Sequence, residues 1–135
     1  MTTLEMLNAA PQTLTVDAAL VAAAIDAASA CAVVCTACAS ACLSEDHPRE
    51  MAVCVRDDLD CADLCGVTAR HLARLNASDK QLTLSLLAAC IEACVQCASS
   101  CAPHRDEHEH CRLGEEACQR CESACQALLD ALKPV

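Results

Sequence analysis

The sequence predicts an all-α protein, an antiparallel up-down-up-down four-helix bundle with a short N-terminal helix. Three observations lead to this prediction. Four long stretches are rich in Ala, Leu, Glu, Gln and Arg, which favour helices. Prolines and short polar clusters separate these stretches, and no stretch alternates apolar and polar residues with the period of a strand. Long helices joined by short loops pack as antiparallel neighbours.

The short helix is expected over residues 4–9. Thr2 and Glu5 form a possible capping box at its start, and Pro11 follows its end. Residues 1–16 therefore form a short N-terminal segment that precedes the bundle.

The four long helices follow from the boundary signals along the chain. Either Thr15 or Asp17 can cap the first of them. Pro48 and Pro103 lie in the loops after the first and third, and the polar run 76–79 forms the turn between the second and third. The four helices are expected at about residues 17–43, 49–75, 80–102 and 106–132.

Length and charge exclude several classes of protein. A chain of 135 residues has the size of one domain, which we take as 1–135. Its 9 Lys+Arg against 19 Asp+Glu give a net charge of -10, which argues against nucleic acid and anionic membranes as partners. The longest uncharged stretch, 27–44, contains four cysteines and is a poor membrane span. Residues 1–8 lack the features of a secretory signal, so we expect a cytoplasmic protein.

The 15 cysteines follow helical spacing. Steps of 4, 3 and 4 residues keep side chains on one face of a helix. The spacing of the first helix recurs in the third after a shift of 59 residues, so the chain resembles a duplicated helical hairpin. We expect all fifteen thiols to face the interior: Cys31, Cys35, Cys38, Cys42, Cys54, Cys61, Cys65, Cys90, Cys94, Cys97, Cys101, Cys111, Cys118, Cys121 and Cys125.

The two ends of the expected bundle differ. The first and third helices end, and the second and fourth begin, at the same pole, and the cysteines extend toward this pole. His47, Met51, His104, His108 and His110 lie at this pole, which we call the mouth. At the other pole apolar residues replace the cysteines and are expected to form a plug, comprising Leu20, Val21, Ala24, Leu72, Leu75, Leu82, Leu86, Leu87, Leu128, Leu129 and Leu132.

Neither disulfides nor simple packing explains the cysteines. Neighbours three or four apart on a helix have Cβ atoms about 5–6 Å apart, whereas a disulfide needs about 3.8 Å, and an odd number cannot pair completely. Cysteine also serves as a small core residue. That role would suit one or two thiols but not fifteen on one face of every helix in a chain without Phe, Trp or Tyr.

The thiols point to a soft metal ion. Thiolates select Cu(I), Zn(II) and iron–sulfur clusters. Structural zinc takes four converging ligands, commonly from paired cysteines on loops, whereas rows of thiols on helices suit ions held by bridging pairs. Monovalent ions at one per thiolate leave the interior nearly neutral, and divalent ions at that ratio would not. We therefore expect Cu(I), on the order of fifteen ions per chain. So many equivalent ligands indicate storage capacity, and nothing in the sequence suggests the open site of an enzyme.

The cysteine motifs and the mouth residues together resemble those of a known protein family. The motifs Cys31-x3-Cys35-x2-Cys38-x3-Cys42 and Cys90-x3-Cys94-x2-Cys97-x3-Cys101, the stripes on the second and fourth helices, and the His/Met mouth are similar to the bacterial copper storage proteins, specifically their cytosolic branch. The resemblance implies a homotetramer of bundles that bind Cu(I) through core thiolates, with metal passing through the His/Met end.

Four further residues are candidate ligands. Met51 and His108 continue the stripes toward the mouth, and His104 lies four residues before His108. Asp58 fills a gap in the stripe of the second helix, where a buried carboxylate would need a metal ion or a hydrogen-bond partner.

Other residues of the mouth and the stripes are weaker candidates for metal ligands. At the gap in the fourth helix either Gly114 or Glu115 faces inward. His110 could bind copper or pair with a carboxylate, whereas His47 and His71 are expected in solvent.

Apolar residues on the outward faces indicate association between protomers. These are Val33, Val34, Val53, Val55, Ile91 and Val95.

Two rival functions stay open. One is a zinc or mixed-metal thiolate buffer, and the other is a thiol-redox or structural bundle that binds no metal.

Overall fold

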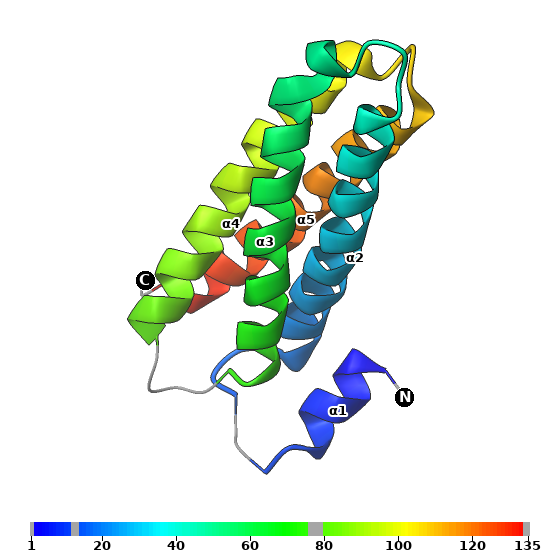
Figure 1. The fold of residues 1–135 in the computed structure, drawn as a ribbon. Helices are drawn as coiled ribbons and strands as arrows, with labels where there is room; N and C mark the ends of the chain where they lie inside the picture. Colours follow the sequence, from blue (N-terminus) through cyan, green and yellow to red (C-terminus); the bar gives the residue numbers. More distant parts are fainter. Residues whose placement is uncertain (1, 12–13, 76–79, 134–135) are drawn as a thin grey trace.

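The computed structural model describes residues 2–11, 14–75 and 80–133, and these form an antiparallel four-helix bundle (Figure 1). The up-down-up-down order is as predicted: α2 packs against α3 and α5, and α4 packs against the same two helices. The bundle helices are α2 (Ala18–Leu43), α3 (Ala52–Ala73), α4 (Lys80–Cys101) and α5 (Glu109–Leu132).

The short N-terminal helix is also confirmed. Helix α1 (Thr3–Ala9) lies beside the N-terminal part of α2 (Figure 1), where the Thr3 hydroxyl donates to Asp26 Oδ1 at 2.6 Å. The Thr2 side chain caps α1 by accepting from the Glu5 amide at 3.1 Å. Of the two candidate caps for α2 the chain uses Asp17, which accepts from the amide of Ala19 at 2.9 Å. The turn expected at 76–79 lies outside the described residues.

The helix boundaries at the mouth differ from those predicted. A 3₁₀ turn, η1 (Pro48–Met51), precedes α3, and another, η3 (Ala102–His104), follows α4. Proline has a fixed φ and no amide hydrogen, so it suits the first positions of such turns. Helix α5 begins at Glu109 rather than near 106, because His108 is extended (φ -132°, ψ 109°) and serves as its N-cap residue. The side chain of His108 is therefore not on the helical stripe.

The interior divides along its length as expected. All fifteen cysteines are buried, and an apolar plug closes the bundle at the end opposite the mouth. One plug residue was predicted wrongly: Leu82 is 58% exposed, and Thr83 takes the inward place because it lies seven residues, two helical turns, before Cys90. Leu20 and Leu86 are only partly buried. The buried plug residues are Val21, Ala24, Leu72, Leu75, Leu87, Leu128, Leu129 and Leu132.

Two segments are long and apolar enough to cross a membrane by length and composition: Ala18–Leu43 and Lys80–His104. Core helices of bundles pass the same test, and both segments direct their cysteines into the bundle. This similarity is weak evidence for a membrane span, and the absence of a membrane partner stays a prediction.

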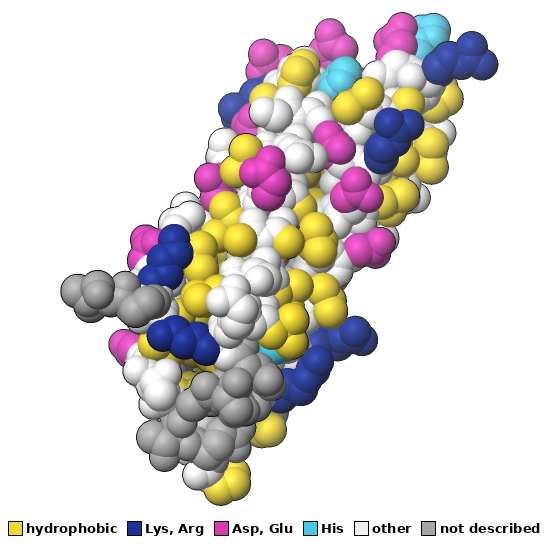
Figure 2. All heavy atoms as spheres, turned by 90° about the vertical axis from the view of Figure 1, so that its left-hand side faces the viewer, with side chains coloured by type: hydrophobic (Ala, Val, Ile, Leu, Met, Phe, Trp, Pro, Cys, Tyr) yellow, Lys and Arg dark blue, Asp and Glu magenta, His cyan; other side chains and the backbone are white. Residues whose placement is uncertain are grey.

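The surface is mixed in character. Figure 2 shows apolar side chains interspersed with acidic ones along the length of one face. Of the six outward apolar residues, Val33, Val53 and Val95 are exposed, with Val33 at 70%. The other three, Val34, Val55 and Ile91, pack partly against the core.

Candidate metal centre

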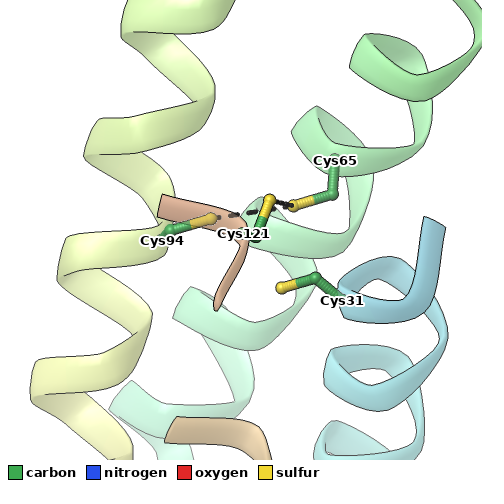
Figure 3. Close-up of side chains that lie close together, drawn as sticks. All are labelled: Cys31, Cys65, Cys94 and Cys121. Atoms are coloured by element: carbon green, nitrogen blue, oxygen red, sulfur yellow. Dashed lines mark hydrogen bonds between the residues drawn. The ribbon is translucent and has the colours of Figure 1, made fainter. Parts of the chain in front are cut away.

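Thiols from all four bundle helices converge in the interior. Figure 3 shows one such set, in which Cys31 of α2, Cys65 of α3, Cys94 of α4 and Cys121 of α5 point toward one another. The Sγ atom of Cys65 lies 3.7 Å from that of Cys121 and 3.8 Å from that of Cys94. Helical spacing produces this convergence because each helix presents its stripe to the common axis of the bundle.

The sets overlap in two groups, and Cys97 connects these groups into one column, because its Sγ lies 3.9 Å from that of Cys35 and 3.0 Å from Asp58 Oδ1. Within each set the ligand atoms all lie within 4.8 Å of one another. Cys31, Cys38, Cys54 and Cys121 each belong to more than one set, so ions bound in one set would share sulfurs with the next. Further sets include Cys31/Cys35/Cys61/Cys118, Cys38/Cys42/Cys54/Cys111, Cys38/Cys54/Asp58/Cys101 and Cys90/Cys121/Cys125.

The sulfur spacing suits bridging metal ions rather than disulfides. All fifteen cysteines are free. The Sγ–Sγ contacts run from 3.4 Å, between Cys54 and Cys101, to 4.0 Å, between Cys38 and Cys42. These distances exceed the roughly 2.05 Å of a disulfide. They are shorter than about 4.6 Å, twice a thiolate–metal bond of about 2.3 Å, so a single ion can bond to both sulfurs of a pair.

Burial favours the protonated form of two thiols at the mouth end, Cys111 and Cys42, in the metal-free chain. It raises the pKa of Cys111 to about 11 and that of Cys42 further above the ordinary thiol value, because a thiolate is poorly solvated in the interior. A metal ion that binds here must displace protons.

Asp58 fills the gap in the α3 stripe, as expected, and is fully buried. Its Oδ1 accepts from the thiol of Cys97 at 3.0 Å and from that of Cys101 at 3.7 Å, and its Oδ2 accepts from Cys54 at 3.7 Å. Burial raises the pKa of Asp58 to about 7, although the hydrogen bond from Cys97 acts in the opposite direction. Asp58 is thus a carboxyl group placed within a thiol set.

Asp58 is expected to make the stability of the metal-free protein depend on pH. Its folded-state pKa is raised, so its contribution is fully present below about pH 4 and is lost as the pH rises through 7. Asp58→Asn should remove this dependence and leave the variant more stable above pH 7, by no more than about 4 kcal/mol at 1.36 kcal/mol per pKa unit. Urea unfolding of reduced protein between pH 4 and 7.5 measures it.

The matched control is Asp60→Asn, which changes an exposed carboxylate on the same helix. It should keep the pH dependence of the unchanged protein. Parallel curves for Asp58→Asn and the unchanged chain would show that Asp58 does not titrate in this range.

Histidines and a carboxylate surround the mouth, with His110 closest to the thiols. Its Nδ1 lies 3.4 Å from Cys38 Sγ and 3.6 Å from Cys111 Sγ. Glu45 Oε2 contacts His110 Nε2 at 3.1 Å and His108 Nδ1 at 2.5 Å. A carboxylate that holds Nε2–H leaves Nδ1 of His110 as an acceptor directed at two thiols.

The remaining mouth candidates lie around this group. Met51 is buried in η1. The ring of His104 lies 6.4 Å from that of His108, which lies 5.5 Å from that of His110 and nearly parallel to it. Sequence spacing ranks His108 above His110 as a ligand and gives no sign that Glu45 lies beside them. The missing signal was the helix start at Glu109, which removes His108 from the stripe.

Three further residues lie in places that the sequence left open or misjudged. Gly114 faces the thiols, since a Cβ built there would lie 3.4 Å from Cys101 Sγ and 3.6 Å from Cys38 Sγ. Glu115 is also buried but pairs with Arg105. His47 is exposed as expected, whereas the prediction for His71 was wrong: it is 8% exposed, and its Nε2 lies 2.8 Å from Thr83 Oγ1.

Free thiols that converge inside a helical bundle, in sets close enough to hold a metal ion, define the class of thiolate metal-binding bundles. Within this class the chain belongs to the copper storage protein family, whose family model matches residues 17–130.

Two solved structures of copper storage proteins and one cysteine-rich sequence relative are similar to this chain. The copper storage protein Ccsp from Streptomyces lividans, loaded with 10 copper equivalents, has a TM-score of 0.93 and 44% identity, covering 96% of this chain and 99% of that one. A structure of copper loading to a cytosolic copper storage protein from Streptomyces lividans, with five coppers, has a TM-score of 0.83 and 45% identity over 85% of this chain and 96% of that one. The uncharacterised cysteine-rich protein YhjQ of Bacillus subtilis (strain 168) is 28% identical over 64% of this chain and 75% of its own length.

Proposed function

We propose that this protein stores and buffers Cu(I) in the cytosol. The observation that carries the proposal is the column of buried, free thiols, in which several sets share sulfurs. Thiolates are the ligands that Cu(I) prefers, and a chain with many equivalent ligands serves capacity. The cytosolic assignment is supported by the similarity to a cytosolic copper storage protein. No step of storage requires catalysis.

Charge balance supports a monovalent cargo. Each Cu(I) that replaces a thiol proton leaves the site neutral, so about one ion per thiolate, on the order of fifteen per chain, builds little buried charge. Asp58 would serve the column as an oxygen ligand or as a hydrogen-bond acceptor for neighbouring thiols.

Copper would enter at the mouth. His110 and Met51 lie at the head of the column, with His104 and His108 outside it. An ion could pass from the Nδ1 atom of His110 to the thiol of Cys38 or Cys111. Glu45 would release His108 or His110 while that histidine binds the ion. His110 therefore joins Met51, Asp58, His104 and His108 as a proposed ligand.

A zinc buffer is the second candidate. The set Cys31/Cys65/Cys94/Cys121 favours it, because four thiolates from four helices can also surround one Zn(II). Sharing of sulfurs between sets argues against zinc throughout the column, since divalent ions would then lack compensating charge. A thiol-redox bundle would need disulfides that form and reduce reversibly.

Anaerobic titration against a strong chelator tests these alternatives. Well over ten Cu(I) per chain bound with high affinity is the expected result. Saturation at three or four Zn(II) with weak copper binding would favour the zinc buffer instead. A count of fifteen free thiols that persists after mild oxidation would exclude the redox function.

We further propose that the chain forms the homotetramer implied by the family resemblance. Exposed valines on the outer faces support an interface. Gly66 adds support: a Cβ built there would meet no described atom within 4 Å, although glycine inside a helix is destabilising relative to alanine. Close approach of a second chain would account for a glycine here. Sedimentation equilibrium should give about four times the mass of one chain, and a monomer would contradict the proposal.

A further inference from the structure

The segment that joins α4 to α5 at the mouth, residues 102–108, is held by two side-chain contacts to other segments. Arg105 Nη1 pairs with Glu115 Oε1 of α5 at 2.7 Å. His108 Nδ1 contacts Glu45 Oε2, beyond the end of α2, at 2.5 Å. We call residues 102–108 the mouth loop. Its two contacts therefore reach α5 and the segment that follows α2, which are neighbours in the bundle.

The two attachments differ in chemistry. Glu45 is about a third exposed, and its histidine partners can instead bind a metal ion or solvent. Glu115 is only 5% exposed, so losing Arg105 would leave a buried carboxylate without its cationic partner. The Arg105 side chain is 43% exposed and loses little solvation in the pair. The pair with Glu115 is thus the more permanent attachment.

The pair with Glu115 lies at the surface groove between α4 and α5, one residue along α5 from the position that faces the thiols. Glu115 follows Gly114, whose missing side chain leaves room for Cys38 and Cys101 against the α5 backbone. Arg105 is adjacent to His104 in the loop. The Arg105–Glu115 pair thereby holds the mouth loop against α5, whereas His108 and Glu45 can separate when a metal ion binds.

We infer that the Arg105–Glu115 ion pair anchors the mouth loop and sets the rate at which reagents and copper reach the thiols, without serving as a metal ligand. The mouth thiols Cys38, Cys54 and Cys111 are at most 2% exposed, so the mouth must open before a reagent can reach them. An anchor that opposes this movement slows passage in both directions and leaves the number of binding sites unchanged. The copper part of this inference rests on the proposed function, whereas the thiol part does not.

The test measures how fast the metal-free, reduced protein reacts with a bulky aromatic disulfide reagent. Glu115→Gln and Arg105→Gln should each increase the initial rate about tenfold, which corresponds to 1.36 kcal/mol in the opening equilibrium. Arg105→Lys retains the charge and should stay near the unchanged rate. The matched control, Arg112→Gln, breaks the more exposed pairs to Glu109 and Glu116 on the same helix and should leave the rate unchanged.

Copper measurements complete the design. Both anchor variants should load Cu(I) from a chelator, and release it, faster than the unchanged protein, with equal final capacity. A lower capacity would make Glu115 a ligand and overturn the inference, as would thiol rates equal to those of Arg112→Gln. Far-UV circular dichroism and melting curves at the assay temperature exclude general unfolding as the cause of faster reaction.

The two proposals fail separately. If the unchanged protein binds little copper, storage is wrong, but the thiol rates still report on the anchor. If the thiol rates do not change, the anchor is wrong, and the copper capacity of the unchanged protein still tests storage.

Discussion

Loading with Cu(I) is expected to raise the melting temperature of the protein by more than about 20 °C. A ligand that binds only the folded state at a thousand times its Kd adds about 4 kcal/mol. In a domain of this size each kcal/mol corresponds to roughly 3–5 °C. Several ions that each join different helices should therefore raise the melting temperature by tens of degrees, even though unfolded thiols also bind copper and reduce the effect.

The structure gives this expectation its physical basis. In the metal-free state the central contacts between helices are thiols 3.4 to 3.9 Å apart, which form only weak hydrogen bonds. Ions bound in a set such as Cys31/Cys65/Cys94/Cys121 would connect four helices through metal–sulfur bonds. The free energy of metal binding would then add directly to the free energy of folding, because the ions hold together the helices that form the interior.

Anaerobic circular dichroism melts at zero, five and ten equivalents of Cu(I) measure the effect. Adding a strong chelator to the loaded sample should restore the lower melting temperature, which shows that bound copper is the cause. A melting temperature independent of copper would mean that the ions bind outside the thiol column.

The spacing of the cysteines predicted the metal column because helical geometry is rigid. Steps of three and four residues can place thiols on only one face, and four such faces can meet only at the bundle axis. The position of Asp58 followed from the same rule, since it replaces a thiol at one step of the stripe.

The mouth could not be predicted in the same way, because its geometry depends on where helices begin and on contacts across loops. His110 reaches Cys38 from α5 only because the helix starts at Glu109. Glu45 meets His110 across a sequence separation of 65 residues, which no local pattern encodes. The burial of His71 likewise depends on Thr83 of the neighbouring helix. Sequence periodicity determines which face a residue occupies, and tertiary contacts determine what it meets there.

The second large effect is expected in the apolar plug. The largest fully buried side chains of the described chain are Leu72, Leu87 and Leu128, so conventional packing is concentrated at the end opposite the mouth. Truncating a buried leucine to alanine removes apolar contacts and leaves a cavity, at a cost of about 2–5 kcal/mol. Leu87→Ala should therefore remove a large share of the roughly 5–15 kcal/mol that stabilises a typical domain.

Leu82→Ala provides the control, since Leu82 lies on the same helix and is 58% exposed. It should change the free energy of unfolding of the reduced, metal-free protein by no more than about 0.5 kcal/mol in urea. Copper loading should restore much of the stability of Leu87→Ala. The thiol column is separate from the cavity, on the mouth side of the plug, and ions bound in it would join the same four helices. If both alanine variants lose equal stability, the plug does not hold the metal-free bundle together. If Leu87→Ala stays unstable at ten equivalents of copper, the plug and the column do not stabilise the bundle independently, and loading requires an intact plug first.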